Sequence, residues 1–286
     1  MKVCIGLSGG VDSAAAAWLL LQEGYDVSSV TMRHIDSNGQ DIESSERIAD
    51  FLGIPHYVLD IRNEFRKEII NPFAEAYRKG ITPNPCIFCN QKIKFGFLLD
   101  WCNQMGYGKI ATGHYVRINH EQENLLLQSG LDINKDQSYF LSLLTAEQRK
   151  NIIFPLGNLT KEHVRKIVSE NKLPIRNNKE SQEICFIKTN YNDFLKDEYQ
   201  FIDQNGDIVD KNGKVIGCHK GYWNYTIGQR RGLGISSQNP LYVIKLNAAK
   251  NIITAGEKKE LYSKEIMFRN GISHIPYIDL NNKQLK

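Results

Sequence analysis

Short apolar runs alternate with helical patterns along the first part of the chain. The expected strands are Lys2–Leu7, Asp26–Met32, His56–Ile61 and Lys109–Thr112, and the expected helices are Asp12–Glu23, Ile42–Leu52, Glu64–Tyr77 and Ile93–Met105. Apolar strands that alternate with helices are typical of a parallel sheet covered on both faces. We therefore predict an α/β fold with a parallel sheet and helices on both of its faces.

The pattern becomes less regular after Gly113. We expect a hairpin around Asn119–Asn124, short helices near Gln137–Lys150, and a helix over Lys161–Asn171 that Thr160 opens. From Tyr199 onward, short alternating runs punctuated by glycines indicate a small β-rich module. Its expected hairpin pairs Leu241–Leu246 with Asn251–Ala255.

The composition is that of an ordinary folded protein. Of the 286 residues 41% are hydrophobic and 24% charged, which excludes a disordered chain. The apolar run Ala14–Leu21 is too short to cross a bilayer, so we interpret it as a buried helix, and with no export signal we expect a cytoplasmic protein. The formal net charge of +4 is compatible with a polyanionic partner but does not by itself indicate one.

The strongest local signal lies between the first expected strand and the first expected helix. It runs through Gly6, Leu7, Ser8, Gly9, Gly10, Val11, Asp12 and Ser13. Glycine amides can approach an oxyanion closely, serines offer hydroxyl groups, and the start of the next helix attracts negative charge. Because an open parallel sheet binds ligands at this edge, we predict a phosphate site.

This loop is neither a dinucleotide-binding fingerprint nor a Walker loop, because Val-Asp-Ser follows its glycines in place of Lys-Ser or Lys-Thr. Hydride transfer and Ras-like chemistry are therefore disfavoured. A carboxylate beside a polyphosphate is repelled unless a cation lies between them, so Asp12 indicates a bridging Mg²⁺. The alternative is a glycine-rich turn, capped by Asp12 or Ser13, that binds nothing.

The chain has six cysteines, and in a reducing compartment such thiols suggest chemistry or metal binding more than structural disulfides. Thr82–Asn90 contains two prolines and joins two expected helices, so we predict a stiff loop there. Lys92 and Lys94 follow it, and together with the start of a helix they favour the thiolate of Cys89 as a nucleophile.

Cys185 lies in Glu180–Ile187, where polar residues give way to apolar ones. A mobile loop that meets a buried strand fits this pattern. Cysteine is among the most frequently buried residue types, so three of the other cysteines are interpreted as core residues: Cys4, Cys102 and Cys218.

The segment Gly221–Gly234 combines aromatic with basic side chains, namely Tyr222, Trp223, Tyr225, Arg230 and Arg231. This combination suits base stacking and phosphate binding by a nucleic-acid site. Strand packing with a basic rim explains it equally well.

The form SGGxDS at Ser8–Ser13 resembles the PP-loop of ATP pyrophosphatases, which adenylate a substrate oxygen and release pyrophosphate. The chain as a whole resembles the bacterial MnmA (TrmU) family of tRNA-specific 2-thiouridylases, in LSGGVDS, TPNPCIFCNQKIKF, ATGHYVR, KDQSYFL and SQEICFI. The resemblance implies an adenine nucleotide α-hydrolase-like catalytic domain over residues 1–198, a small β-rich domain over 199–262, and the start of a β-barrel over 263–286.

The resemblance also implies a reaction. The loop would bind ATP together with Met32 and Gly113, and O2 of the wobble uridine would attack the α-phosphate, so that pyrophosphate leaves. Cys185 would carry the incoming sulfur as a persulfide, and Cys89 would act as the nucleophile and pair with it in a disulfide. AMP would leave as sulfur enters at C2. Asp12 would complete the catalytic set, with Mg²⁺ bound through ATP.

Contacts with tRNA follow from the same resemblance. The flipped target base would border Asn84, Pro85 and Cys86, because C2 is inaccessible within a stack. Further tRNA contacts would come from His114, Lys135, Asp136 and Gln137. Taken alone, a hydrogen-bonded structural histidine and a solvated turn are the ordinary interpretations of these residues. The expected partners are tRNA and a sulfur-donor protein, either a persulfide relay or a cysteine desulfurase, with no membrane and a monomeric chain in the absence of tRNA.

The chain departs from the family pattern at two places. Many members have Asp where this chain has Cys86, so Cys86, Cys89 and Cys185 could instead hold an iron–sulfur cluster. The chain also ends soon after Lys264, where the final β-barrel of the family begins, so we expect an incomplete tRNA-binding end.

Two other classes of function stay open at this point. A PP-loop ligase acting on a small metabolite needs the nucleotide loop but neither Cys89 nor Cys185. A zinc- or cluster-stabilised RNA-binding module leaves Asp12 without a role, and the usual CxxC…CxxC ligand pattern is absent from the sequence.

Overall fold

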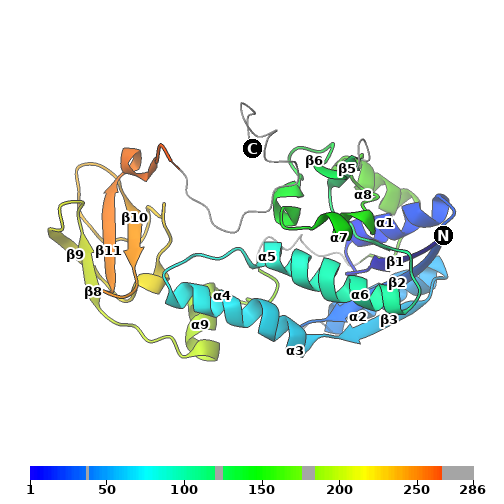
Figure 1. Ribbon diagram of the computed structural model, residues 1–286, viewed down its shortest axis with the longest axis horizontal. Coiled ribbons are helices and arrows are strands. Elements are labelled where there is room, and N and C mark those ends of the chain that lie inside the picture. Colours follow the sequence, from blue (N-terminus) through cyan, green and yellow to red (C-terminus); the bar gives the residue numbers. More distant parts are fainter. Residues whose placement is uncertain (37–38, 120–124, 176–183, 266–286) are drawn as a thin grey trace. The chain divides into compact units, whose positions relative to one another are not determined.

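The computed structural model describes residues 1–36, 39–119, 125–175 and 184–265. This part of the chain forms two compact units (Figure 1). The first contains residues 1–69 and 86–175, and the second contains residues 70–85 and 184–265. The predicted boundaries after residues 198 and 262 stay predictions, and most of the expected β-barrel segment, residues 266–286, lies outside the described residues.

A five-stranded parallel sheet with strand order β3-β2-β1-β4-β7 forms the centre of the first unit. The strands are β1 (Lys2–Gly6), β2 (Asp26–Arg33), β3 (His56–Asp60), β4 (Lys109–Ala111) and β7 (Ile152–Ile153). The predicted parallel sheet is confirmed. Sequence periodicity does not reveal β7, because two residues are too few to make a pattern.

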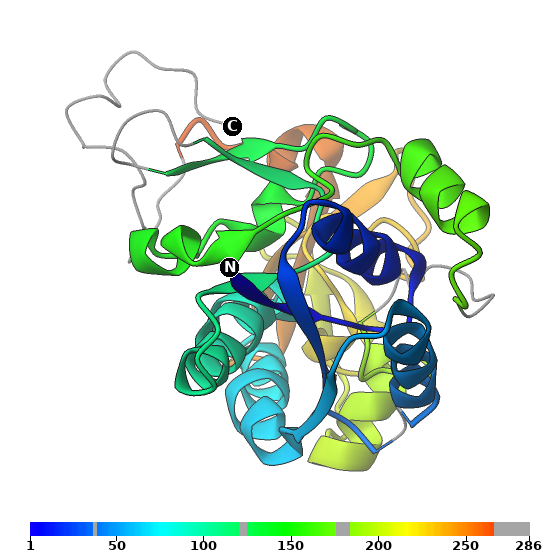
Figure 2. The ribbon, with the colours of Figure 1, turned by 90° about the vertical axis from the view of Figure 1, so that its right-hand side faces the viewer.

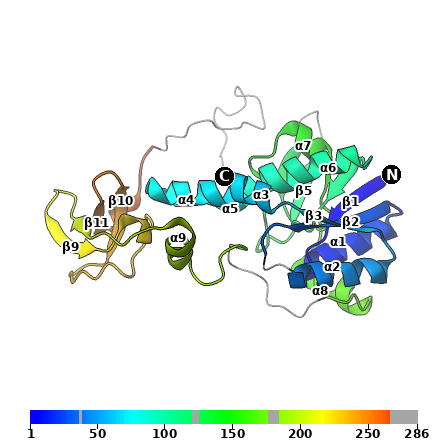
Figure 3. The same ribbon diagram turned by 90° about the horizontal axis from the view of Figure 1, so that it is seen from below.

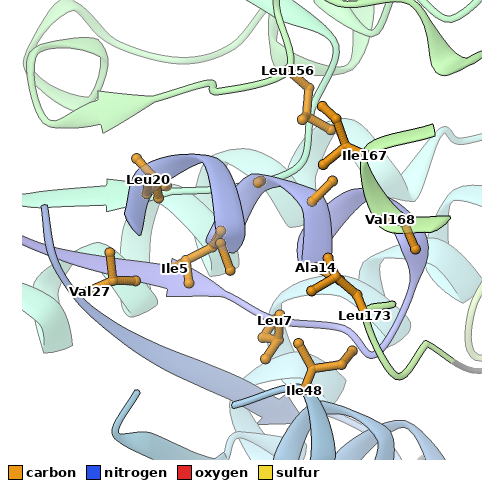
Figure 4. Close-up of a cluster of buried hydrophobic side chains, with 14 of the residues drawn as sticks. Ile5, Leu7, Ala14, Leu20, Val27, Ile48, Leu156, Ile167, Val168 and Leu173 are labelled. Carbon is orange, nitrogen blue, oxygen red and sulfur yellow. The ribbon is translucent and has the colours of Figure 1, made fainter. Parts of the chain in front are cut away.

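Helices cover both faces of this sheet (Figures 2 and 3). Val3 and Ile5 of β1 belong to one buried cluster, part of which Figure 4 shows, and Cys4 between them belongs to a cluster on the opposite face. Successive strand residues point to opposite faces, which is why these three apolar residues follow one another. The helices that complete the clusters are α1 (Val11–Gln22), α2 (Gly39–Leu52) and α8 (Lys161–Glu170) on one face, and α6 (Leu98–Gln104) on the other.

The helix that carries Cys86 and Cys89 begins earlier than predicted. Three helical segments, α5 (Pro85–Phe88), η2 (Cys89–Phe97) and α6, follow one another without a break. The predicted stiff loop over Thr82–Asn90 is therefore wrong from Pro85 onward. Proline lacks an amide hydrogen, but the first turn of a helix needs none, so Pro85 opens the helix. η2 is π-helical, with hydrogen bonds between residues five apart, and this widened turn reappears at the site.

The remaining elements of the first unit confirm the expected hairpin and short helices. β5 (Val116–Asn119) pairs antiparallel with β6 (Leu126–Ser129), and the connecting residues 120–124 lie outside the described part. The helical elements are α3 (Arg62–Phe65), η1 (Arg66–Ile70), η3 (Ser138–Leu141) and α7 (Ala146–Lys150). The Thr160 side chain accepts a hydrogen bond from the His163 amide and caps α8, as predicted. None of the described helices is both long and apolar enough to cross a bilayer.

The second unit contains a mixed four-stranded sheet with strand order β10-β11-β8-β9. Its strands are β8 (Gly206–Val209), β9 (Val215–His219), β10 (Leu241–Asn247) and β11 (Ile252–Glu257), and the unit also holds α4 (Asn71–Arg78), α9 (Tyr191–Tyr199), η4 (Tyr222–Asn224) and η5 (Lys258–Leu261). The predicted antiparallel pairing of β10 with β11 is confirmed. Phe73 of α4 packs against Phe194 of α9, with ring centroids 6.3 Å apart.

Two predictions about cysteine surroundings are wrong. Ile184–Ile187 forms a turn, not a strand, with the Ile187 amide 3.0 Å from the Ile184 carbonyl, and the adjoining residues 176–183 of the predicted mobile loop lie outside the described part. Phe186 is buried against Phe73 and anchors this turn. The apolar residues that suggested a strand are explained by this one contact. Cys4 and Cys102 are core residues as expected, but Cys218 is exposed on β9, the edge strand of its sheet.

Candidate active site

The order in which the chain adds strands to the parallel sheet reverses at β1. The chain leaves β1 for β2 on one side and later returns to place β4 on the other, so the loops after β1 and β4 separate at this point. Ligands of open α/β sheets bind at such a switch point. A Cβ atom on Gly113, just after β4, would lie 2.9 Å from the Asp12 carbonyl carbon and 3.0 Å from the Ser13 nitrogen. Glycine is therefore required for the end of β4 to touch the start of α1.

The loop after β1 is held in a shape that suits an anion. Gly9 has φ +75°, and a Cβ there would lie 2.8 Å from the Ser44 Cβ. The Ser44 hydroxyl donates to the Gly9 carbonyl at 3.2 Å, and the Ser13 hydroxyl donates to the Gly10 carbonyl at 3.1 Å. Among the residues that the structure describes, the amides of Gly9 and Gly10 have no acceptor. With carbonyls engaged and amides available, the loop can bind a phosphate group.

The Asp12 carboxylate joins this loop to two other segments. Lys161 Nζ lies 2.8 Å from each carboxylate oxygen, and the Tyr115 hydroxyl donates to Oδ1 at 2.7 Å. The Lys161 side chain is 8% exposed and that of Asp12 34%. The sequence argument that Asp12 needs Mg²⁺ is therefore weakened, because Lys161 already supplies a cation. Neither Lys161 nor Tyr115 is predicted from the sequence; the cap at Thr160 marks only where Lys161 enters a helix.

The segment expected to contact tRNA makes several hydrogen bonds within the protein. Gln137 Oε1 accepts from the Tyr115 amide at 3.0 Å, and the Gln137 amide donates to the Tyr115 carbonyl at 3.3 Å. The Asp136 carboxylate accepts from the Ser138 amide and hydroxyl at 3.1 and 2.8 Å. These bonds hold Tyr115 against Asp12, while the predicted tRNA contacts of Lys135, Asp136 and Gln137 stay predictions.

His114 and Met32 also lie at this edge of the sheet. His114 is only 8% exposed, and its Nδ1 lies 2.7 Å from the Thr112 hydroxyl. Burial lowers the pKa of His114 well below its ordinary value, so the ring is neutral at pH 7. Met32, at the end of β2, is partly buried against the core. A tRNA contact by His114 and an ATP contact by Met32 stay predictions.

Cys89 and Lys94 share one face of η2, because residues five apart align in a π-helix. Burial raises the pKa of the Cys89 thiol, and the Lys94 ammonium acts in the opposite direction. Burial has the larger effect, so the pKa of Cys89 lies above its ordinary value, and the role of Cys89 as a nucleophile stays a prediction. Lys92 pairs with Glu68 at 2.8 Å, so the two lysines, equivalent in the sequence, differ in role.

The other predicted residues of the cysteine segment differ in exposure. Cys86 is exposed, Pro85 is buried and Asn84 is partly buried. Cys185 is exposed and belongs to the second unit. Within the described ranges, no three His, Cys, Asp or Glu side chains are grouped to hold a metal ion. Cluster ligation by Cys86, Cys89 and Cys185 stays a prediction.

Known proteins resemble the chain along most of its length. A family model described as the tRNA methyl transferase HUP domain matches residues 1–189, and one described as the tRNA methyl transferase PRC-barrel domain matches residues 192–257. A tRNA-specific 2-thiouridylase from Caldanaerobacter subterraneus is 43% identical over 94% of this chain and 78% of its own length. One from Treponema denticola is 46% identical over 93% of this chain and 76% of its own length.

The chain belongs to the tRNA-specific 2-thiouridylase family. A further 2-thiouridylase, from Fusobacterium nucleatum, aligns with 99% of this chain and 84% of its own length at 40% identity. Similarity to solved structures is weaker: a predicted tRNA methyltransferase subunit from Methanocaldococcus jannaschii covers 59% of the chain with a TM-score of 0.39 and 23% identity. Membership of the 2-thiouridylase family therefore rests on the sequence relatives and the matching family models.

Lys161→Met tests the charge pair in this 2-thiouridylase-family chain. The substitution should lower the free energy of unfolding by roughly 1–3 kcal/mol, because the partly buried Asp12 carboxylate loses its cation. The matched control on the same helix is Lys166→Met, whose ammonium lies 3.7 Å from Glu170 with both side chains exposed. That change should stay within about 0.5 kcal/mol. Urea unfolding measures both, and equal effects would contradict the assigned role of Lys161.

Lys94→Met and Lys92→Met separate the two lysines beside Cys89. A cation stabilises the thiolate, so removing Lys94 should raise the pKa of Cys89 further and slow its alkylation at neutral pH by roughly threefold or more. Removing Lys92, which is paired with Glu68, should change the rate by less than about twofold. The measurement is the iodoacetamide reaction rate of the Cys89 peptide by mass spectrometry. A larger effect from Lys92→Met than from Lys94→Met would contradict the placement of Lys94 beside Cys89.

Proposed function

We propose that the chain is a tRNA sulfurtransferase that replaces the C2 oxygen of the wobble uridine with sulfur, using ATP and releasing AMP and pyrophosphate. The observation that carries the proposal is the anion-binding loop at the switch point of the sheet, closed by Gly113 against Asp12. A loop of this kind supports ATP binding, and the relatives of the chain are named 2-thiouridylases. The loop accounts for activation by ATP, and the relatives indicate that the activated substrate is tRNA.

In the first step, the uridine O2 attacks the α-phosphate and pyrophosphate leaves. The amides of Gly9 and Gly10 and the start of α1 would bind phosphate oxygens. The C2 oxygen of uridine is a poor leaving group. Adenylation makes that oxygen part of AMP, which can leave. Mg²⁺ bound together with ATP would neutralise phosphate charge. Oδ1 of Asp12 accepts from both Lys161 and Tyr115, whereas among the described residues Oδ2 accepts only from Lys161 and is the oxygen that would have capacity left for that ion.

In the second step, the terminal sulfur of a persulfide on Cys185 attacks C2, and AMP leaves with the original oxygen. The Cys89 thiol then attacks the Cys185 sulfur, which breaks the S–S bond, releases 2-thiouridine and leaves a Cys89–Cys185 disulfide. Burial keeps Cys89 protonated in the described state, so this attack requires loss of its proton. A thiol reductant must first reduce the Cys89–Cys185 disulfide to two thiols. A sulfur-donor protein can then reload Cys185, whose exposed side chain suits such a transfer.

Contacts with the target base are proposed for Asn84, Pro85 and Cys86. The two-unit division places Asn84 and Pro85 in the second unit and Cys86 at the start of the next segment of the first. The iron–sulfur route through Cys86, Cys89 and Cys185 also makes 2-thiouridine. It differs from the persulfide route because product formation would require a bound cluster, which absorbs visible light. A methyl transfer, which the family-model description mentions, needs neither ATP nor cysteine.

Three variants, assayed with tRNA, ATP and a sulfur donor under anaerobic conditions, test the proposed steps. Asp12→Ala should abolish ATP-to-AMP turnover. Cys185→Ser should retain ATP consumption but yield no thiouridine, because activation precedes sulfur delivery. Cys218→Ser is the control, since Cys218 is exposed but has no role in the proposal. Nucleoside mass spectrometry and nucleotide chromatography measure the products.

Thiouridine from Cys185→Ser would contradict the role of that residue. Absorption spectra of the same samples separate the two sulfur routes: thiouridine formed without an iron–sulfur chromophore supports the persulfide, and formation that requires the chromophore supports the cluster. Methylated uridine that depends on a methyl donor in place of ATP would overturn the proposed function.

A further inference from the structure

Arg230 and Arg231 are exposed in the second unit, in the loop between η4 and β10. Several other basic side chains of this unit are paired: Lys196 with Asp203 at 2.9 Å, Lys211 with Glu260 at 3.4 Å and Lys259 with Glu257 at 2.8 Å. Within the described part of the chain, no carboxylate pairs with either arginine. Two adjacent guanidinium groups are therefore available for an anion from outside.

The backbone that carries these arginines is closely braced. Gln229 Oε1 accepts from the Thr226 amide at 3.0 Å, and Gln229 Nε2 donates to the Arg231 carbonyl at 2.9 Å. The Gly228 amide donates to the Val243 carbonyl at 2.8 Å, and the Val243 amide donates to the Gln229 carbonyl at 2.9 Å, which ties the loop to β10. These bonds fix the backbone on both sides of Arg230.

Three glycines of the loop also adopt the left-handed conformation that favours glycine: Gly228 at φ +88°, Gly232 at +83° and Gly234 at +67°. They turn the chain sharply on both sides of the arginine pair. The base of each arginine is thus held in a defined position while its side chain extends into solvent. Such preorganisation lowers the entropy cost of binding a ligand.

The same loop is bonded to the segment that is proposed to border the target base. The Thr82 hydroxyl lies 3.2 Å from the Thr226 hydroxyl, and the Tyr222 hydroxyl donates to the Arg78 carbonyl at 2.6 Å. A Cβ on Gly80 would lie 3.5 Å from Leu246 of β10. All these residues belong to the second unit, so Thr82, two residues before Asn84, is fixed beside the arginine loop.

We propose that Arg230 and Arg231 bind backbone phosphates of the tRNA close to the target uridine. A guanidinium group binds phosphate with two parallel hydrogen bonds and always carries its charge. Taking a base out of its stack also requires that the neighbouring backbone be held in place. The proposal rests on the proposed function in one respect, that the target base lies at Asn84.

The test compares the Arg230→Gln, Arg231→Gln double variant with wild type, using unmodified tRNA and fluorescence anisotropy at several salt concentrations. Loss of two phosphate contacts should weaken binding roughly tenfold at moderate salt and reduce the slope of log affinity against log salt by about 1.5. Lys211→Gln, Lys214→Gln removes the same charge from the turn between β8 and β9, and it should change affinity less than about twofold.

Arg230→Lys, Arg231→Lys keeps the charge and removes the two-pronged hydrogen bonding. It should retain the salt slope and recover only part of the affinity. Binding of ATP alone should be equal in all variants, which confirms that the first unit is intact.

Unchanged tRNA affinity and salt slope in the glutamine variant would overturn the proposal. Normal tRNA binding with slower reloading by the sulfur-donor protein would also overturn it and would assign the loop to a protein partner. Failure of the proposed function gives a different result: wild type binds tRNA, the glutamine variant binds it less well, and neither makes thiouridine.

Discussion

The Asp12 carboxylate is the point on which the nucleotide site of the first unit depends. It stands at the start of α1, and it receives hydrogen bonds from Lys161 of α8 and from Tyr115 after β4. Gly113 allows the end of β4 to approach the same residue. The start of α1, the residues after β4 and the start of α8 are thereby held together at the switch point of the sheet. Packing and internal hydrogen bonds are thus sufficient to shape the loop that is proposed to bind phosphate.

The two units contribute different parts of the proposed chemistry. The first provides the nucleotide loop and Cys89, where burial and Lys94 act on the thiol in opposite directions. The second provides Cys185 and the braced loop of Arg230 and Arg231. The segment from Ile70 to Pro85 belongs to the second unit although it lies between two parts of the first in the sequence. In the proposed reaction, base recognition by Asn84 and Pro85 therefore belongs to the β-rich unit, and nucleotide binding belongs to the unit with the parallel sheet.

Much of the first unit follows from sequence pattern, and the exceptions have physical causes. Strands buried on both faces, such as Val3 to Ile5, leave short continuous apolar runs that can be recognised in the sequence. The start of a helix at Pro85 is hidden, because proline both breaks helices and opens them. Lys161 looks like any lysine at a helix start until the fold brings Asp12 to it. The nucleotide loop is predictable as a local motif, whereas its partners depend on contacts across more than a hundred residues.

The central claim is that ATP activates the C2 oxygen of the base. The most direct measurement uses an anticodon stem-loop RNA with ¹⁸O at C2 of the target uridine, incubated with the protein, ATP and a sulfur donor. If O2 attacks the α-phosphate and sulfur then displaces it, mass spectrometry will find one ¹⁸O in the phosphate of the released AMP for each thiouridine formed. Thiouridine accompanied by AMP without the label would contradict the account.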